Sequence, residues 1–140
     1  MHVVMNSFKS ICFFIFGALL GTSCFWFVAY HEQINDKYYL GATDTLDQMS
    51  VWYDLGDGGI GRIGETVFSV GWDERYIIAK QHPLNQRAIT NYYILDMAKD
   101  DAFADPEESV IGPLDEEDFQ LKLQEMGLSL DFTVTINALE

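Results

Sequence analysis

Cysteine is nearly absent from this chain of 140 residues, since only Cys12 and Cys24 occur and both lie in the first 30 residues. The remainder therefore has neither a disulfide framework nor a metal site built on thiolates. Basic side chains are scarce too, with 8 lysines and arginines against 22 aspartates and glutamates and a formal net charge of −14. This balance argues against a nucleic-acid partner, because neutralising phosphates requires a basic face.

Charged side chains are missing altogether between Lys9 and His31. The apolar run at residues 11–30 has about the length of a bilayer-spanning helix, because ~20 residues at ~1.5 Å each give ~30 Å. We therefore expect residues 1–30 to be an N-terminal transmembrane anchor or a lipoprotein-like signal helix. Lys9 precedes the run and Glu32 follows it, which predicts a soluble part on the outer side of the cell membrane or envelope.

The fate of this segment has three interpretations: a retained anchor, a cleaved signal peptide, or a lipoprotein signal whose Cys24 is acylated. The small residues Gly21, Thr22 and Ser23 before Cys24 suit a signal peptidase. A lipoprotein signal, however, normally has a branched aliphatic residue at the position of Gly21. The apolar run also continues past Cys24 to Tyr30, beyond the ~7–15 residues of a signal peptide's apolar region, which favours retention.

The rest of the chain is predicted to form a polar linker at residues 31–36 and one acidic domain at residues 37–140. Apolar runs bounded by Gly, Asp or Asn predict strands. These runs lie at residues 38–42, 49–55, 65–71, 75–81 and 91–97. The fourth and fifth runs are apolar on both faces and should form the centre of the sheet. Trp72, Asp73 and Glu74 predict a tight hairpin turn between the third and fourth runs.

One helix is marked after Asp115, which can cap its N-terminus. Phe119, Leu123 and Met126 share one face at helical spacing, and Gly127 supplies a left-handed end. Residues 128–136 alternate apolar and polar as an edge strand does. The acidic segment at residues 96–109 is predicted to be a mobile loop. The expected fold is α+β, a mostly antiparallel sheet of about five or six strands with one C-terminal helix on one face.

Several short motifs within residues 51–127 resemble a family of small, uncharacterised bacterial envelope proteins, often predicted lipoproteins, that is classed as a domain of unknown function. The motifs are Gly71-Trp72-Asp73, residues 76–83 (YIIAKQHP), residues 91–96 (NYYILD) and Gly112-Pro113-Leu114. The resemblance implies a location in the envelope but supplies no catalytic residues. The weak lipoprotein signal at Cys24 departs from the lipoprotein members.

The stretch from Asp54 to Glu65 partly matches two glycine-containing binding motifs. The order Gly59, Gly61, Gly64 matches a dinucleotide-binding pattern, but a strand follows where a helix is needed, which favours a glycine hairpin. Asp54, Gly59 and Glu65 fit a calcium-loop template, but Gly56 and Gly58 stand where the template requires oxygen ligands, which argues against a calcium site. The acidic residues of the segment at 100–108 offer a looser cation site, but the pattern favours a solvated, charge-rich loop.

The candidate binding surface from sequence comprises Trp72, Asp73, Arg75, Lys80 and His82. Lys80 and Arg75 are expected to offset neighbouring carboxylates, and His82 to end a strand and hydrogen-bond locally. We expect no cofactor, no metal and no catalytic residue. The sequence thus predicts a membrane-tethered extracytoplasmic binding or structural module. The alternatives are an immunity-like or inhibitory protein that captures a basic partner through charge steering, and an envelope hydrolase that uses His82 as acid or base.

Overall fold

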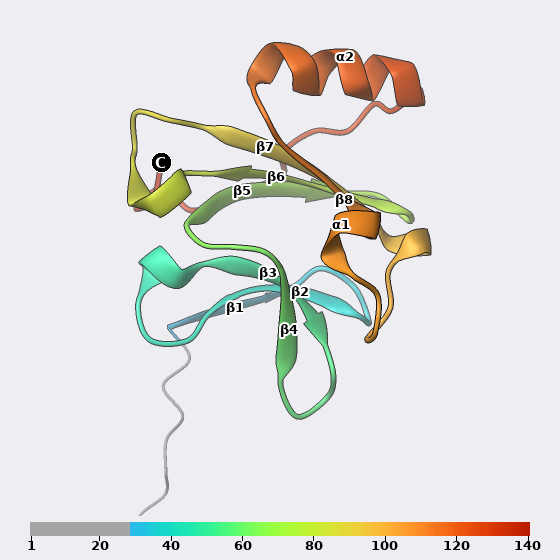
Figure 1. The fold of residues 1–140 in the computed structure, drawn as a ribbon. Coiled ribbons are helices and arrows are strands. Elements are labelled where there is room, and N and C mark those ends of the chain that lie inside the picture. Colours follow the sequence, from blue (N-terminus) through green and yellow to red (C-terminus); the bar gives the residue numbers. More distant parts are fainter. Residues whose placement is uncertain (1–28) are drawn as a thin grey trace, which may run out of the picture.

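The computed structural model describes residues 29–140 and arranges them as two antiparallel sheets that pack face to face, with one helix beyond the second sheet (Figure 1). The first sheet has the strand order β1-β2-β3-β4 and the second β8-β7-β6-β5-β9. The strands are β1 (Tyr30–Gln33), β2 (Tyr38–Ala42), β3 (Ser50–Asp54), β4 (Gly59–Ile63), β5 (Val67–Trp72), β6 (Tyr76–Gln81), β7 (Asn91–Asp96), β8 (Val110–Leu114) and β9 (Val134–Thr135). The α-helices are α1 (Pro106–Ser109) and α2 (Glu116–Met126), and 3-10 turns occur at Leu46–Gln48, Pro83–Asn85 and Met97–Lys99.

The prediction of one sheet with five or six strands is wrong, because the described residues form nine strands in two sheets. Antiparallel pairing and the C-terminal helix are confirmed. The division has a packing reason, since α2 covers only one face of one sheet and the apolar inner faces of the two sheets bury each other. The expected linker at residues 31–36 also differs, because its first half pairs with β2 as part of β1.

The main core lies between the two sheets and a smaller one lies under α2. The main core contains buried side chains of both sheets, among them Tyr38, Leu40, Val51, Val67, Val70, Ile77 and Leu95. The smaller core contains Ile78, Tyr92 and Ile94 of the second sheet with Phe119 and Leu123 of α2. The second sheet is therefore covered on both faces, which agrees with the prediction that β6 and β7 are central.

Helix α2 begins and ends where its sequence signals predict. The Asp115 side chain accepts a hydrogen bond from the Asp118 backbone N–H at 2.8 Å, which satisfies one of the free donors of the first turn. Gly127 ends the helix in the left-handed conformation at φ 67°. Phe119 and Leu123 are buried against the second sheet. The local capping and periodicity signals are thus consistent with the tertiary packing.

The C-terminal alternation predicts exposure better than it predicts pairing. From Leu128 to Asn137 the even-numbered residues are half-buried and the odd-numbered ones exposed, but only Val134 and Thr135 form a strand. That strand lies at the edge of the second sheet, beside β5. The preceding residues pass so close to β5 that a Cβ on Gly71 would collide with the Asp131 backbone. Leu128, Leu130 and Phe132 pack into the core under α2, whereas Val134 and Ile136 pack against the main core.

The acidic segment at residues 96–109 is ordered, so the prediction of a mobile loop is wrong. It carries the turn Met97–Lys99 and helix α1, and the Asp100 carboxylate forms an ion pair with Arg62 of β4 at 2.9 Å. The Arg62 and Asp100 side chains are 1% and 0% exposed. The Tyr38 hydroxyl (2.8 Å) and the Ser109 hydroxyl (3.2 Å) also donate to Asp100. A buried guanidinium requires a buried counter-charge, and this requirement holds the segment against the first sheet.

The expected anchor falls on residues that the structure leaves undescribed. Residues 1–28, which include Cys24, lie outside the described part, and Tyr30 already begins β1. Among residues 29–140 no helix is both long and apolar enough to cross a bilayer.

Substituting Asp100→Asn should lower the free energy of unfolding by about 3–5 kcal/mol, because it leaves the Arg62 charge buried without a counter-charge. Urea unfolding measures this difference. The matched control is Glu125→Gln, which removes one partner of the exposed Lys122–Glu125 pair and should change stability by less than about 0.5 kcal/mol. The double variant Arg62→Met, Asp100→Leu should recover part of the loss. Equal effects of the two single variants would contradict a structural role for the buried pair.

Candidate functional site

Two of the residues predicted to bind a ligand instead shape the β5–β6 turn. One oxygen of the Asp73 carboxylate accepts hydrogen bonds from the backbone N–H groups of Arg75 (2.8 Å) and Tyr76 (2.6 Å). The predicted hairpin is thereby confirmed, with its turn fixed by an Asx-type contact. Trp72 is half-buried against the core between the sheets. Asp73 and Trp72 therefore have clear roles in folding.

Arg75 offsets a carboxylate, as the sequence predicts. Its guanidinium donates to both oxygens of Asp96, at 3.0 and 2.9 Å, and lies over the Tyr76 ring at 5.0 Å. These hydrogen bonds lower the pKa of Asp96, the backbone N–H of Ala98 lowers it further, and burial opposes them. Because of this bidentate pairing, the Arg75 guanidinium already has a carboxylate partner in its own chain.

Lys80 and His82 lie in different environments. The Lys80 ammonium lies over the rings of Phe132 (4.6 Å) and Tyr92 (5.7 Å) rather than beside a carboxylate, so that part of the expectation is wrong. His82 is 3% exposed and stacks on Phe68 at a centroid distance of 4.2 Å. Its Nδ1 lies 2.8 Å from the Ile89 carbonyl oxygen, which can only accept, so Nδ1 carries the proton.

The expectation that His82 ends a strand and hydrogen-bonds locally is confirmed. The whole of β6 separates it from the turn at Asp73 and Glu74, so neither of these carboxylates lies beside His82 to support acid–base chemistry. The five predicted residues thus occupy a turn, two faces of the second sheet and a buried strand end. The structure does not bring them together into one surface.

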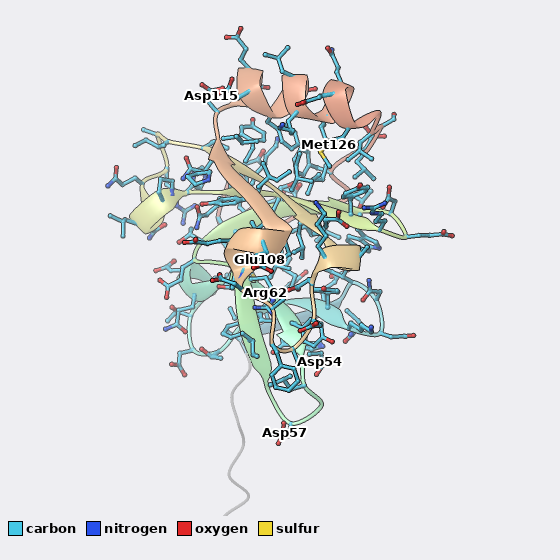
Figure 2. The ribbon with its side chains drawn as sticks, turned by 45° about the vertical axis from the view of Figure 1, so that its right-hand side comes forward. Asp54, Asp57, Arg62, Glu108, Asp115 and Met126 are labelled. Atoms are coloured by element: carbon cyan, nitrogen blue, oxygen red, sulfur yellow. The ribbon has the colours of Figure 1, made fainter. Side chains whose placement is uncertain are left out.

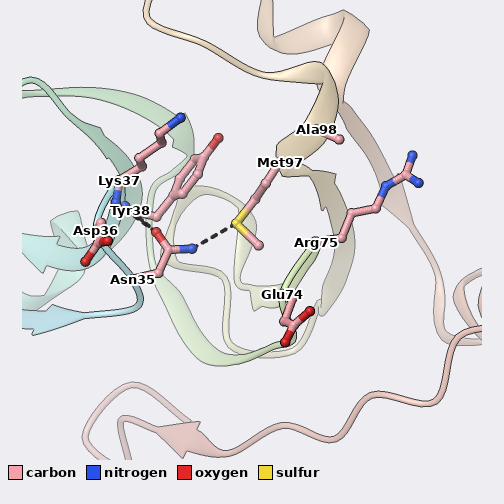
Figure 3. A pocket seen from close by; sticks show the side chains of 8 residues that line it. All are labelled: Asn35, Asp36, Lys37, Tyr38, Glu74, Arg75, Met97 and Ala98. Atoms are coloured by element: carbon pink, nitrogen blue, oxygen red, sulfur yellow. Dashed lines mark hydrogen bonds between the residues drawn. The ribbon is translucent and has the colours of Figure 1, made fainter.

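A hollow of about 530 Å³ lies where the β1–β2 turn meets the β5–β6 turn and Met97. It is lined by Asn35, Asp36, Lys37, Tyr38, Glu74, Arg75, Met97 and Ala98. Figure 3 shows the Asn35 side chain directed at the Met97 sulfur, 3.1 Å away, while Arg75 and Glu74 point away from this contact. The charged side chains that line this hollow are of both signs, and Arg75 is already paired with Asp96. We interpret it as an open seam between turns.

A smaller hollow of about 300 Å³ lies on the outer face of the first sheet and has a more consistent chemistry. We call it the aromatic groove. It is lined by Tyr30, His31, Tyr39, Gly41, Ala42, Thr43, Trp52, Asp57, Gly58 and Gly59. Strand alternation places its rings outward, because Tyr38 and Leu40 point into the core and Tyr39 between them faces the other side. Tyr39 pairs with Trp52 of β3, whose neighbour Val51 is also in the core.

Three rings form a row across three strands of this face. His31 of β1 stacks on Tyr39 of β2 at a centroid distance of 4.6 Å and an angle of 28°. Tyr39 and Trp52 of β3 are parallel within 10° at 6.3 Å. The indole N–H of Trp52 donates to the Gly41 carbonyl at 3.0 Å, which fixes the ring. The row is therefore held in place before any ligand arrives.

Glycines make room for these rings. A Cβ on Gly41 would lie 2.9 Å from the Tyr39 ring, and one on Gly59 would collide with the Tyr39 hydroxyl. A Cβ on Gly58 would meet nothing within 4 Å. The glycine hairpin predicted from sequence is confirmed, and it brings Asp57 and Gly58 to the rim of the groove.

The groove has an acidic lining. Asp57 lines it, and no lysine or arginine is among its lining residues. Burial raises the pKa of Tyr39, and the nearby Asp54 carboxylate raises it further. Burial also raises the pKa of Tyr30 to about 12, with added effect from its hydrogen bond to Glu32. Burial and the neighbouring carboxylates thus both favour the protonated form of these two hydroxyls.

Within residues 29–140 no three His, Cys, Asp or Glu side chains gather as metal ligands would. The acidic segment at 96–109 instead directs Asp100 to Arg62.

The aromatic groove was not predicted from the sequence. The available signal was the pattern of Tyr39, Gly41 and Trp52, with aromatic and glycine residues at alternate, outward positions.

Comparison with known proteins identifies one family. The model of a family described as "Protein of unknown function (DUF3997)" matches residues 35–137. No curated protein and no solved structure matches the chain. The matched region includes every strand of both sheets except β1.

Substituting Gly59→Ala should lower the free energy of unfolding by about 1–3 kcal/mol, because the added methyl group overpacks the site of the Tyr39 hydroxyl. Gly58→Ala, one residue away, points into open space and should change stability by less than about 0.5 kcal/mol. Urea unfolding followed by near-ultraviolet circular dichroism measures both stability and ring packing. Indistinguishable results for the two variants would show that Tyr39 does not occupy this position.

Proposed function

Because the chain belongs to the DUF3997 family, whose description assigns no activity, we propose a function from its own geometry: a binding module whose ligand site is the aromatic groove. In this proposal the N-terminal segment, residues 1–30, tethers the module to the membrane, and the domain acts outside the cytoplasm. The module captures its ligand without transforming it.

The observation that carries this proposal is the fixed row of His31, Tyr39 and Trp52 in a hollow that no described helix covers. Aromatic side chains left partly in water cost free energy that burial against another element would recover. Concave sites lined mostly by apolar rings with a few polar groups are the usual form of ligand sites. A row already fixed by a hydrogen bond also loses little conformational entropy on binding.

The proposed tether places the groove close to the membrane surface. Tyr30 lines the groove and ends the apolar run at residues 11–30. The backbone N–H of Ala29 donates to the Thr43 carbonyl, so the chain enters the first sheet beside the groove. Each extended residue spans at most ~3.6 Å, which leaves no room for a long spacer between tether and groove. A ligand would therefore be met at the membrane surface.

The hydrolase alternative finds less support in the geometry. His82, its proposed acid or base, is buried, and its Nδ1–H is used by the Ile89 carbonyl. Catalytic groups need access to the reacting atoms at hydrogen-bond distance. The groove, by contrast, contains rings, glycines and one carboxylate, which is a set suited to holding a ligand.

A reporter that is active only outside the cytoplasm, fused after Glu140 in the native cell, should be active and remain with the membrane fraction. The intact mass of the recovered chain should show an N-terminus that retains residues 1–28. A mass that begins at an acylated Cys24 would keep the tether but change its chemistry. Reporter activity only on the inner side would contradict the proposed location.

Placing the photo-crosslinking amino acid p-benzoylphenylalanine at Gly58 should give a defined adduct in native cells, since this position lines the groove and has open space around it. The same amino acid at the exposed Gln120 of α2 is the matched control and should give no such adduct. Combining the Gly58 probe with Trp52→Leu should abolish the adduct. Absence of any Gly58-specific, Trp52-dependent adduct would overturn the groove as ligand site.

A further inference from the structure

We propose that the aromatic groove receives a cationic side chain, a guanidinium or ammonium group, of a basic polypeptide. This inference rests on the proposed function and specifies its ligand class. The groove offers ring faces and the Asp57 carboxylate, and its lining includes no lysine or arginine that would compete. A cation is attracted both by the negative face of an aromatic ring and by a carboxylate.

The chain itself uses this pairing elsewhere. Arg62 lies over Tyr53 at 5.6 Å and Arg75 over Tyr76 at 5.0 Å. Lys80 lies over both Tyr92 and Phe132. In the described part of the chain no such cation lies over Tyr39, the central ring of the row, or over Trp52 at its end. The groove therefore has the aromatic rings of a cation–ring pair, and a partner would supply the cation.

The charge of the whole chain selects among occupants. With 22 acidic and 8 basic side chains, its field accelerates the approach of a basic partner and repels phosphates. A lipid headgroup that carries an ammonium also carries a phosphate, which this field opposes. A neutral sugar can stack on a ring and donate a hydroxyl to Asp57, but it carries no charge and gains nothing from the acidic field. The cationic side chain of a polypeptide is the ligand that uses every feature of the groove.

The size and place of the groove fit one anchoring side chain. Its volume of about 300 Å³ lies at the lower end for small-ligand sites, so a folded segment does not enter it. Figure 2 shows Asp57 at the outer end of the β3–β4 hairpin, far from α2, which runs between the labelled Asp115 and Met126. The rest of the partner would lie along this hairpin. A charge on α2 therefore tests the general field without touching the groove.

The test measures binding of a hexa-arginine peptide to the full chain in a nonionic polyoxyethylene detergent by titration calorimetry. Its neutral counterpart is a hexa-citrulline peptide, which keeps the shape of the side chain and replaces the guanidinium by a urea. We expect hexa-citrulline to bind at least about tenfold more weakly. Trp52→Leu and Asp57→Asn should each weaken hexa-arginine binding at least about fivefold.

The matched control is Glu117→Gln, which makes the same charge change on the exposed face of α2 and should alter the affinity less than about twofold. Asp57 is exposed and makes no side-chain hydrogen bond in the structure, so Asp57→Asn tests the site even if Trp52→Leu unfolds. Equal weakening by Asp57→Asn and Glu117→Gln would overturn the inference, because binding would then be diffuse. Equal affinity for the two peptides, or preferential binding of maltohexaose or phosphatidylcholine vesicles, would overturn it as well.

These outcomes separate the two proposals. A Gly58 adduct together with failure to bind hexa-arginine would reject the cationic ligand and leave the groove as a binding site. Absence of a Gly58-specific, Trp52-dependent adduct in the otherwise unchanged chain would reject the groove itself.

Discussion

The buried ion pair between Arg62 and Asp100 is the constraint on which the rest of the domain depends. It joins β4 of the first sheet to the segment that follows β7 of the second, across 38 residues of sequence. Two charges without solvent are tolerated only when their hydrogen-bonding capacity is satisfied, and here the Tyr38 and Ser109 hydroxyls complete the carboxylate's partners. The pair opposes any relative placement of the two sheets that would bury one of these charges without the other.

This constraint also determines what the outer face of the first sheet displays. Tyr38 must face inward to reach Asp100, so Tyr39 must face outward. A slip of one residue in β2 would bury Tyr39 and withdraw Tyr38 from the ion pair, and both changes are unfavourable. The pairing of Tyr39 with Trp52 then carries the same orientation into β3. The aromatic groove is therefore a consequence of how the core is held, which explains why its rings stay in place without a covering element.

Sequence reasoning succeeded where the determining interaction is local and failed where it is distant. The cap at Asp115, the stop at Gly127 and the turn at Asp73 depend on neighbours within a few residues, and the structure has all three. The order of segment 96–109 depends on Arg62, and a run of acidic residues contains no information about a counter-charge so far away. The division into two sheets, and with it the groove, depends on strand register and on which apolar faces meet. The expectation of a domain of unknown function is confirmed by membership of the DUF3997 family, but the motifs on which the resemblance was based and the envelope location that it implies stay predictions.

The same charge imbalance that favours a basic partner disfavours a second copy of the chain as the occupant of the groove. Two copies would each bring a formal charge of −14, and their repulsion opposes any contact that is not strongly complementary. Three of the basic side chains needed to bridge two copies already have partners in their own chain. Arg62 and Arg75 pair with carboxylates, and Lys80 lies over aromatic rings. An exposed aromatic face on a neutral protein would invite self-association. On this chain the acidic field opposes self-association through the aromatic groove, which leaves the groove open to the proposed basic ligand.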